Sequence, residues 1–329
     1  MKKKILKATA YGLLGLGMLI FLAALYIKVG LPDVGDPPQL TVERTPERLS
    51  RGKYLVHHVS LCVDCHSERD MSRFAGPIIE GSLGKGGEKF DVGAGVYYAR
   101  NITPAGIGDW TDGELFRAIT MGVSKDGRAL FPVMPHPAYG QMDEEDILSI
   151  IAYVRSLKPV ESIIPQPVSH FPMNFIINTI PKKASFKKMP DKQNVLAYGG
   201  YLVNAASCAD CHSPRDDQGN KIDGMDFAGG EQFPLPDGSI VISANITPDK
   251  ETGIGNWTRE QFFSRFRQYS DPASCYPVEK GSFNTIMPWS QYAGMTDEDL
   301  HAIYTYMSSL TPVKNKITRF TSSTAVAQN

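Results

Sequence analysis

The hydrophobic and polar positions divide the chain into one long apolar run followed by two regions of helical periodicity. No charge occurs from Ala8 to Ile27, and this run of about 20 residues is long enough for a helix to cross the hydrocarbon core of a bilayer. Two later segments, 146–157 and 299–310, place apolar residues at the i, i+3, i+4 and i+7 positions of one helix face. These residues are Ile147, Ile150, Ile151 and Val154, and then Leu300, Ile303, Tyr304 and Met307. The pattern predicts one membrane-spanning helix and two amphipathic helices.

Helix-start signals predict a mainly α-helical fold. Thr45-Pro46 is typical of an N-cap followed by proline in the first turn. Thr111 with Glu114, and Thr258 with Gln261, each form the capping-box pattern before an apolar-periodic run. The glycine-rich segment 81–95 is expected to form loops rather than strands.

The basic residues Lys2 to Lys4 orient the apolar helix. Positive residues stay on the cytoplasmic side, so everything after Lys28 is expected on the outer, periplasmic face of a bacterial cytoplasmic membrane. We interpret residues 1–30 as an uncleaved anchor. A cleaved secretory signal is the alternative, for which Ala23-Ala24 is only a weak cleavage site. The proline-containing residues 31–44 then predict a short stiff spacer.

Beyond the spacer, the chain contains the same series of sequence marks twice. The paired marks are Gly52-Lys53-Tyr54-Leu55-Val56 and Gly200-Tyr201-Leu202-Val203, Phe74-Ala75-Gly76 and Phe227-Ala228-Gly229, Asn101-Ile102-Thr103-Pro104 and Asn245-Ile246-Thr247-Pro248, and Met134-Pro135 and Met287-Pro288. Their common order predicts two copies of one small helical domain, at 45–160 and 195–315. Residues 161–194 would be the interdomain linker and 316–329 a C-terminal tail.

Each copy contains Cys-x-x-Cys-His, the pattern of covalent c-type haem attachment. Cys62 and Cys65 would form thioether bonds, and His66 would bind the iron as its proximal ligand. Cys208, Cys211 and His212 repeat the arrangement, so we expect two haem c groups. Structural zinc, a redox dithiol or a disulfide are the alternatives for a single CxxC. Two copies that carry the adjacent histidine, far apart in the sequence, favour haem.

Methionines at matching positions are the expected sixth ligands of the two irons. Met134 and Met287 are both followed by proline and both precede the last helix of their copy. His136 competes in the first copy, but Trp289 occupies the matching place in the second. A single methionine more often fills a hydrophobic core, but the matching positions of these two favour their interpretation as iron ligands. A thioether ligand raises the reduction potential relative to two histidines.

Three further residues are candidates for supporting contacts. Pro77, or a carbonyl beside it, would accept a hydrogen bond from His66 and fix its ring. Trp110 and Trp257 would donate indole N–H groups to haem propionates, although a buried aromatic is an equally good interpretation of each. Net charge is −1, which gives no indication of a nucleic-acid partner.

With these motifs in place, both halves resemble class I cytochrome c domains. The run from Asn245 to Asp249 and then Thr252 to Thr258 is similar to the multihaem cytochrome c subunits of membrane-bound alcohol, gluconate and related dehydrogenases. Those subunits usually carry three cytochrome domains, whereas this chain has two and an N-terminal anchor. The resemblance implies an electron-transfer protein rather than an enzyme, with a dehydrogenase subunit or an oxidase as redox partner.

Two enzyme classes remain as alternatives. A dihaem peroxidase needs an open position on one iron, which a methionine ligand in both copies disfavours. A thiosulfate-oxidising dihaem enzyme would need a cysteine ligand, and Cys275 is the one cysteine outside the haem motifs. We interpret Cys275 first as a core thiol.

Overall fold

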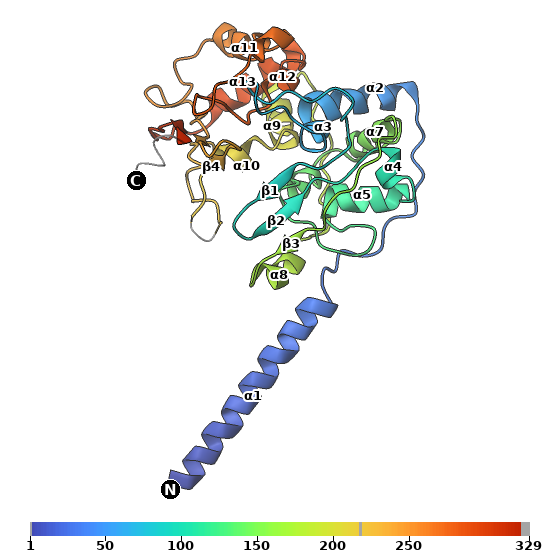
Figure 1. The fold of residues 1–329 in the computed structure, drawn as a ribbon, viewed down its shortest axis with the longest axis vertical. Helices are drawn as coiled ribbons and strands as arrows, with labels where there is room; N and C mark the ends of the chain where they lie inside the picture. The colour runs from blue at the N-terminus through green and yellow to red at the C-terminus, as the bar shows by residue number, and fades with distance from the viewer. Residues whose placement is uncertain (1, 217–218, 324–329) are drawn as a thin grey trace.

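The computed structural model describes residues 2–216 and 219–323, and its most prominent feature is a long helix projecting from a folded body (Figure 1). This helix, α1 (Lys2–Val29), is long and apolar enough to cross a membrane, and none of its residues is buried. The body is mainly helical, as the sequence predicts, with two small antiparallel sheets. The last part of the predicted tail, 324–329, lies outside the described residues.

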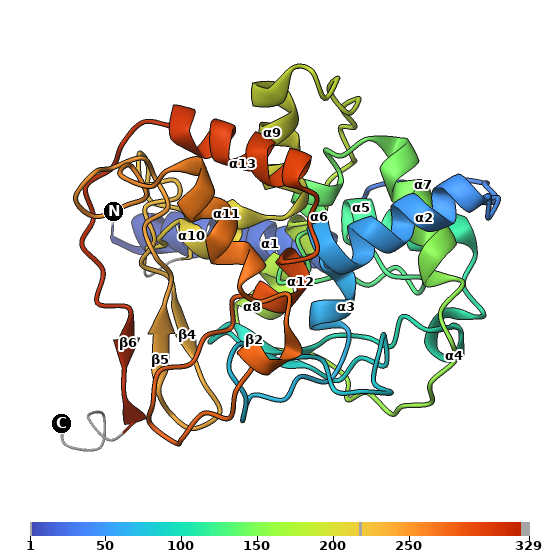
Figure 2. The same ribbon diagram turned by 90° about the horizontal axis from the view of Figure 1, so that it is seen from above.

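The two halves of the body have a closely matching order of elements, and they lie side by side in the view from above (Figure 2). The first half contains α2 (Pro46–Tyr54), the π-helix η1 (Leu55–Val59), α3 (Cys62–Cys65), β1 (Lys89–Asp91), β2 (Gly95–Tyr98), α4 (Pro104–Ile107), α5 (Asp112–Met121), α6 (His136–Tyr139), α7 (Glu144–Val154) and β3 (Val168–Ser169). After α8 (Met173–Ile176) and the 3₁₀-helix η2 (Ile177–Thr179), the second half contains α9 (Val195–Ala205), α10 (Cys208–His212), β4 (Gln232–Pro234), β5 (Ile240–Ile242), α11 (Arg259–Arg267), the 3₁₀-helix η3 (Pro272–Ser274), α12 (Trp289–Tyr292), α13 (Asp297–Ser309) and β6 (Phe320–Thr321).

The predicted helix starts are confirmed. Thr45 caps α2, with proline in its first turn. Both capping boxes are present, because each threonine side chain accepts from the backbone N–H of the predicted Glu114 or Gln261. Acidic residues occupy the first turns of α7 and α13, where the helix dipole favours negative charge.

In each half the first helix crosses the last one at a glycine. A Cβ atom on Gly52 of α2 would lie 1.9 Å from the Ser149 carbonyl oxygen of α7. A Cβ atom on Gly199 of α9 would lie 2.0 Å from the Ala302 carbonyl oxygen of α13. Only glycine permits backbones to approach this closely, which explains why both copies carry a glycine two residues before the tyrosine of the mark, Tyr54 or Tyr201.

The small sheets correct two sequence expectations. Segment 81–95 contains strand β1 and the start of β2, so it is not entirely loop. Strand β3, from the expected linker, pairs with β2, and β6, from the expected tail, pairs with β5. Each half therefore takes its third strand from beyond the expected boundary.

The Asn-Ile-Thr-Pro marks form hydrogen bonds with the segment that follows the last helix of each half. Asn101 accepts from the backbone and hydroxyl of Thr103 and donates to the Val160 carbonyl. Asn245 makes the same bonds to Thr247 and to the Val313 carbonyl. The repeat thus includes the segments that follow α7 and α13.

Reciprocal hydrogen bonds join the two halves. The Tyr54 hydroxyl of α2 donates to Asp299 Oδ2 of α13 at 2.5 Å, and the Tyr201 hydroxyl of α9 donates to Asp146 Oδ2 of α7 at 2.5 Å. Buried apolar residues from both halves form one continuous cluster around these bonds. The halves are therefore related by an approximate twofold arrangement.

Candidate functional site

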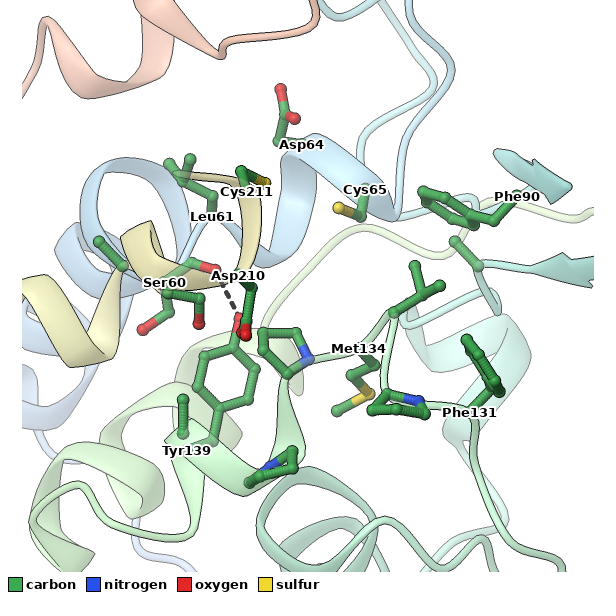
Figure 3. Close-up of a pocket in the computed structure, with 18 of the residues that line it drawn as sticks. Ser60, Leu61, Asp64, Cys65, Phe90, Phe131, Met134, Tyr139, Asp210 and Cys211 are labelled. Atoms are coloured by element: carbon green, nitrogen blue, oxygen red, sulfur yellow. Dashed lines mark hydrogen bonds between the residues drawn. The ribbon is translucent and has the colours of Figure 1, made fainter. Parts of the chain in front are cut away.

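Both Cys-x-x-Cys-His motifs line one large cavity between the halves. Its volume is about 2730 Å³, and it is lined by residues of both halves. Cys65 of α3 and Cys211 of α10 appear together at this cavity, with Asp64 and Asp210 beside them (Figure 3). Both motifs therefore open onto one shared space, which is large enough to hold large planar groups.

The residue before each first cysteine has the same unusual backbone conformation. Leu61 has φ 52° and ψ 35°, and Ser207 has φ 52° and ψ 34°, both in the left-handed region. This conformation costs a non-glycine residue about 1–2 kcal/mol. Its repetition at one motif position indicates that the motif helix must begin at a fixed orientation relative to the cavity.

The motif histidines are fixed by backbone carbonyls. His66 Nδ1 lies 2.6 Å from the Arg100 carbonyl oxygen, and His212 Nδ1 lies 2.8 Å from that of Ala244. Burial, the largest cause, lowers the pKa of both imidazoles, so they are neutral. Neutral rings with Nδ1–H donated to a carbonyl keep the Nε2 lone pair free for a metal. Both histidines line the cavity.

The expected role of Pro77 is corrected by these contacts. The Pro77 carbonyl accepts from the Asp70 backbone N–H, while Arg100 supplies the carbonyl beside His66. Arg100 lies at the end of the β2 strand, more than thirty residues along the chain from the histidine. Proximity in sequence to the motif was the wrong criterion, because the fold brings the edge of the small sheet to the histidine.

The motif cysteines face the cavity as protonated thiols. Burial raises the pKa of Cys62 and Cys208 to about 12, and that of Cys211 to about 11. Cys65 and Cys211 are open to the cavity although protein surrounds them. No cluster of three or more His, Cys, Asp or Glu residues suited to a metal ion occurs in residues 2–216 and 219–323. The donor set therefore disfavours zinc and fits covalent attachment of haem.

Met134 and Met287 lie in matching turns at the cavity. The backbone N–H of His136 donates to the Met134 carbonyl at 2.7 Å, and that of Trp289 donates to the Met287 carbonyl at 2.8 Å. Both methionines line the cavity. His136, the competing ligand, is 1% exposed and is absent from the cavity lining. Burial lowers its pKa to about 4.

A hydrogen bond holds each of these turns against its motif. The Tyr139 hydroxyl donates to the Ser60 carbonyl at 2.8 Å, as drawn in Figure 3. The Tyr292 hydroxyl donates to the Ala206 carbonyl at 3.1 Å. Each tyrosine follows its methionine by five residues, and each carbonyl precedes the first motif cysteine by two. The turn with the methionine and the motif with the histidine are thus fixed to each other on the cavity wall.

Arginines that sequence reasoning missed also line the cavity. In the second half Arg319, next to β6, and Arg265 of α11 make no salt bridge with any described residue. Burial and then Arg265 lower the pKa of Arg319. Two cations that repel each other in a partly buried cavity favour an anionic group between them. In the first half, burial and then Arg128 lower the pKa of Arg100, but Arg128 also forms a salt bridge with Asp126 at 3.9 Å.

Trp110 and Trp257 line the same cavity, so the structure brings them to the expected site. Their hydrogen bonding to a propionate stays a prediction. The arginines had no sequence mark, because Ala244 stands where the first copy has Arg100 and the repeat does not show them.

Known proteins similar to this chain were found at about 30% identity, whereas no protein-family model matches it. The alcohol dehydrogenase (quinone) cytochrome c subunit of Gluconacetobacter polyoxogenes is 30% identical over 80% of this chain and 56% of its own length. The gluconate 2-dehydrogenase cytochrome c subunit of Pantoea cypripedii is 30% identical over 85% of this chain and 63% of its own length. The "diheme cytochrome c-type" protein of Cereibacter sphaeroides is 26% identical over 91% of this chain and 98% of its own length.

These similarities relate the chain to c-type cytochromes. More particularly, it is a homologue of the cytochrome c subunits of alcohol, gluconate and fructose dehydrogenases. The chain spans little more than half the length of the first of these relatives, and almost the whole length of the dihaem protein.

Proposed function

We propose that the chain is a dihaem c-type cytochrome, built as two class I cytochrome c domains, that transfers electrons at the outer face of the cytoplasmic membrane. One observation carries the proposal. The same unit occurs twice around one cavity: a left-handed residue, a Cys-x-x-Cys-His helix, a histidine held through Nδ1, and a methionine in a matching turn. A bound haem supplies reversible one-electron chemistry between ferric and ferrous iron.

The residues of the chain divide the work in the same way in both halves. Cys62 and Cys65 would hold the first haem and Cys208 and Cys211 the second. His66 and His212 would bind iron through Nε2, and Met134 and Met287 would complete the coordination. The arginines at the cavity would neutralise propionates. The helix α1 would anchor the body to the membrane, which places both sites on its outer face.

The enzyme alternatives are disfavoured by contacts in the cavity. A peroxidase would need one iron without a side-chain ligand, yet a methionine lines the cavity in both halves. A thiosulfate-oxidising enzyme would need Cys275 as a ligand, but this side chain is 2% exposed and is absent from the cavity lining.

Haem counting and ligand replacement test the cofactor assignment. Purified protein is expected to contain two covalent haems per chain. The double variant Cys62→Ser/Cys65→Ser is expected to contain one. Met134→Ala and Met287→Ala should each remove half of the near-infrared methionine-to-iron band, while Met142→Leu, which alters a buried methionine away from the cavity, should leave it intact. An unchanged band in either alanine variant contradicts that ligand.

The physiological partner requires a separate experiment. The relatives are named as dehydrogenase subunits, so we propose that this chain accepts electrons from a dehydrogenase, or from the quinol side, and passes them to a respiratory acceptor. Gentle detergent extraction followed by haem-stained native separation should show this chain with a dehydrogenase subunit. Migration with oxidase subunits would place it on the acceptor side instead.

A further inference from the structure

The segment between the two halves touches the end of the apolar helix. The Asn178 side-chain amide of η2 donates to the Ile27 carbonyl of α1 at 3.2 Å, and Lys28 Nζ lies 5.9 Å from the ring centre of Phe175 in α8. In Figure 1, α8 lies at the edge of the body nearest to α1. We refer to residues 171–180 as the foot.

The position of these contacts along α1 fixes their depth in a membrane. The uncharged run from Ala8 to Ile27 covers about 30 Å at 1.5 Å per residue, which equals the thickness of the hydrocarbon core. Lys28 and the Ile27 carbonyl therefore fall at the boundary between acyl chains and headgroups. Because the foot is bonded to them, it lies at that boundary too.

The foot exposes apolar side chains that nothing in the described structure covers. Phe171 is 82% exposed and Ile176 is 44% exposed. The two rings of Phe171 and Phe175 pack edge to face, with centroids 6.5 Å apart. Exposed apolar side chains on a short helix favour burial among lipid headgroups and upper acyl chains. Lys182 and Lys183, which follow the foot after Pro181, are exposed, and this suits an anionic lipid surface.

We propose that the foot is a second membrane contact, which inserts Phe171 and Ile176 into the lipid surface and fixes the orientation of the first half. This rests on the proposed function, because it requires α1 to span the bilayer. Met173, Asn174 and Ile177 of the same segment line the cavity. The foot therefore turns the cavity wall of the first half towards the membrane and leaves α11, at the far end of the body in Figure 1, in water.

Spin labelling of the full haem-loaded chain in nanodiscs of phosphatidylethanolamine and phosphatidylglycerol tests this. Phe171→Cys and Ser264→Cys, an exposed position on α11, are each labelled with a nitroxide. Cys275 is buried and the remaining cysteines carry haem, so the unlabelled parent gives the background. An unchanged haem spectrum shows that each variant is folded. We expect the ratio of oxygen to nickel-complex accessibility to be several-fold higher at 171 than at 264.

Two failures are distinguishable. If the chain remains in the nanodisc but gives the same ratio at both positions, the proposed lipid contact of the foot is refuted, while membrane anchoring by α1 still holds. A protein partner would then be the occupant of the apolar face. A chain whose α1 has been removed, shown by intact mass, does not enter the nanodisc, and that outcome overturns the anchor and the foot together.

Discussion

Replacing Tyr54 or Tyr201 by phenylalanine is the most direct test of how the two halves are held together. Each tyrosine belongs to one half, and its hydroxyl makes two hydrogen bonds to the last helix of the other half. It donates to a buried aspartate in that helix and accepts from the backbone N–H of the residue that caps it. The Tyr54 hydroxyl accepts from Thr296 at 3.0 Å, and the Tyr201 hydroxyl accepts from Asp143 at 3.1 Å. The substitution removes one oxygen atom and leaves the ring packing intact.

The expected losses are similar in size but differ in origin. Tyr54→Phe leaves Asp299, 1% exposed, with the Tyr198 hydroxyl as its other side-chain partner. A hydrogen bond to a charged group contributes about 1.5–3 kcal/mol, so we expect the free energy of unfolding to fall by about 2–3 kcal/mol. In Tyr201→Phe, Asp146 keeps both bonds from Arg51 at 2.8 Å, which lowers the carboxylate contribution to about 1 kcal/mol. The buried Asp143 amide then loses its acceptor, which adds about 1–2 kcal/mol.

Urea unfolding of the haem-loaded chain in detergent, followed by Soret circular dichroism, measures both losses. Tyr306→Phe is the matched control, since it removes a hydroxyl from α13 that makes no hydrogen bond with a described residue. Its free energy of unfolding should stay within about 0.5 kcal/mol of the parent. The reasoning is refuted if Tyr54→Phe and Tyr201→Phe are no more destabilising than this control.

Three other changes have expected outcomes that follow from single contacts. Gly199→Ala should lower the free energy of unfolding by about 1–3 kcal/mol or more, because its Cβ would meet the Ala302 backbone. Gly200→Ala should lower it by less, since the new Cβ would meet only a side-chain ring. Equal losses in urea unfolding would contradict this reasoning. Burial lowers the pKa of His57 from 6.5 to about 4, so the stability that the neutral ring contributes is present above pH 6.5 and is lost as the pH falls towards 4. This loss is at most about 3 kcal/mol, and His57→Phe should remove it from the pH dependence of thermal unfolding; an identical pH profile would contradict the assignment. Arg319→Gln should lower the reduction potential of the second site by roughly tens of millivolts in a potentiometric titration, whereas Arg319→Lys should keep most of it.

The parts of the fold that the sequence predicted depend on local chemistry. A capping box needs only Thr111 and Glu114 three residues apart, and the helix start at Thr45 needs only the adjoining proline. The haem motif is likewise contiguous in the chain. Such features are readable because the residues that make the contact are also neighbours in the sequence.

The parts that were missed depend on contacts between distant segments. Strands β1 and β2 are only three and four residues long, too short for their alternation to stand out in the sequence. The third strand that completes their sheet comes from Val168–Ser169, about seventy residues later. The carbonyl beside His66 comes from Arg100 for the same reason, because the small sheet delivers it. No spacing within the motif encodes either contact.

A difference in length between the two copies, just before the haem motif, shows which contacts are kept. Cys62 follows Tyr54 by eight residues, whereas Cys208 follows Tyr201 by seven. Both ends of the longer segment are fixed, at one end by the bond to Asp299 and at the other by the left-handed residue before the motif. The extra residue is therefore absorbed inside the helix, as the π-turn η1.

Because the π-turn takes up the extra residue, a second pair of reciprocal contacts between the halves is kept. Counted back from the motif cysteines, His58 and Asn204 occupy the same position. His58 Nδ1 lies 2.7 Å from the Gln291 carbonyl oxygen, and the Asn204 amide donates to the Ala138 carbonyl at 2.9 Å. These carbonyls lie in α12 and α6, the short helices that follow the two methionines. Each half thus positions the methionine turn of the other, and the insertion was accommodated where it disturbed neither the motif nor this exchange of contacts.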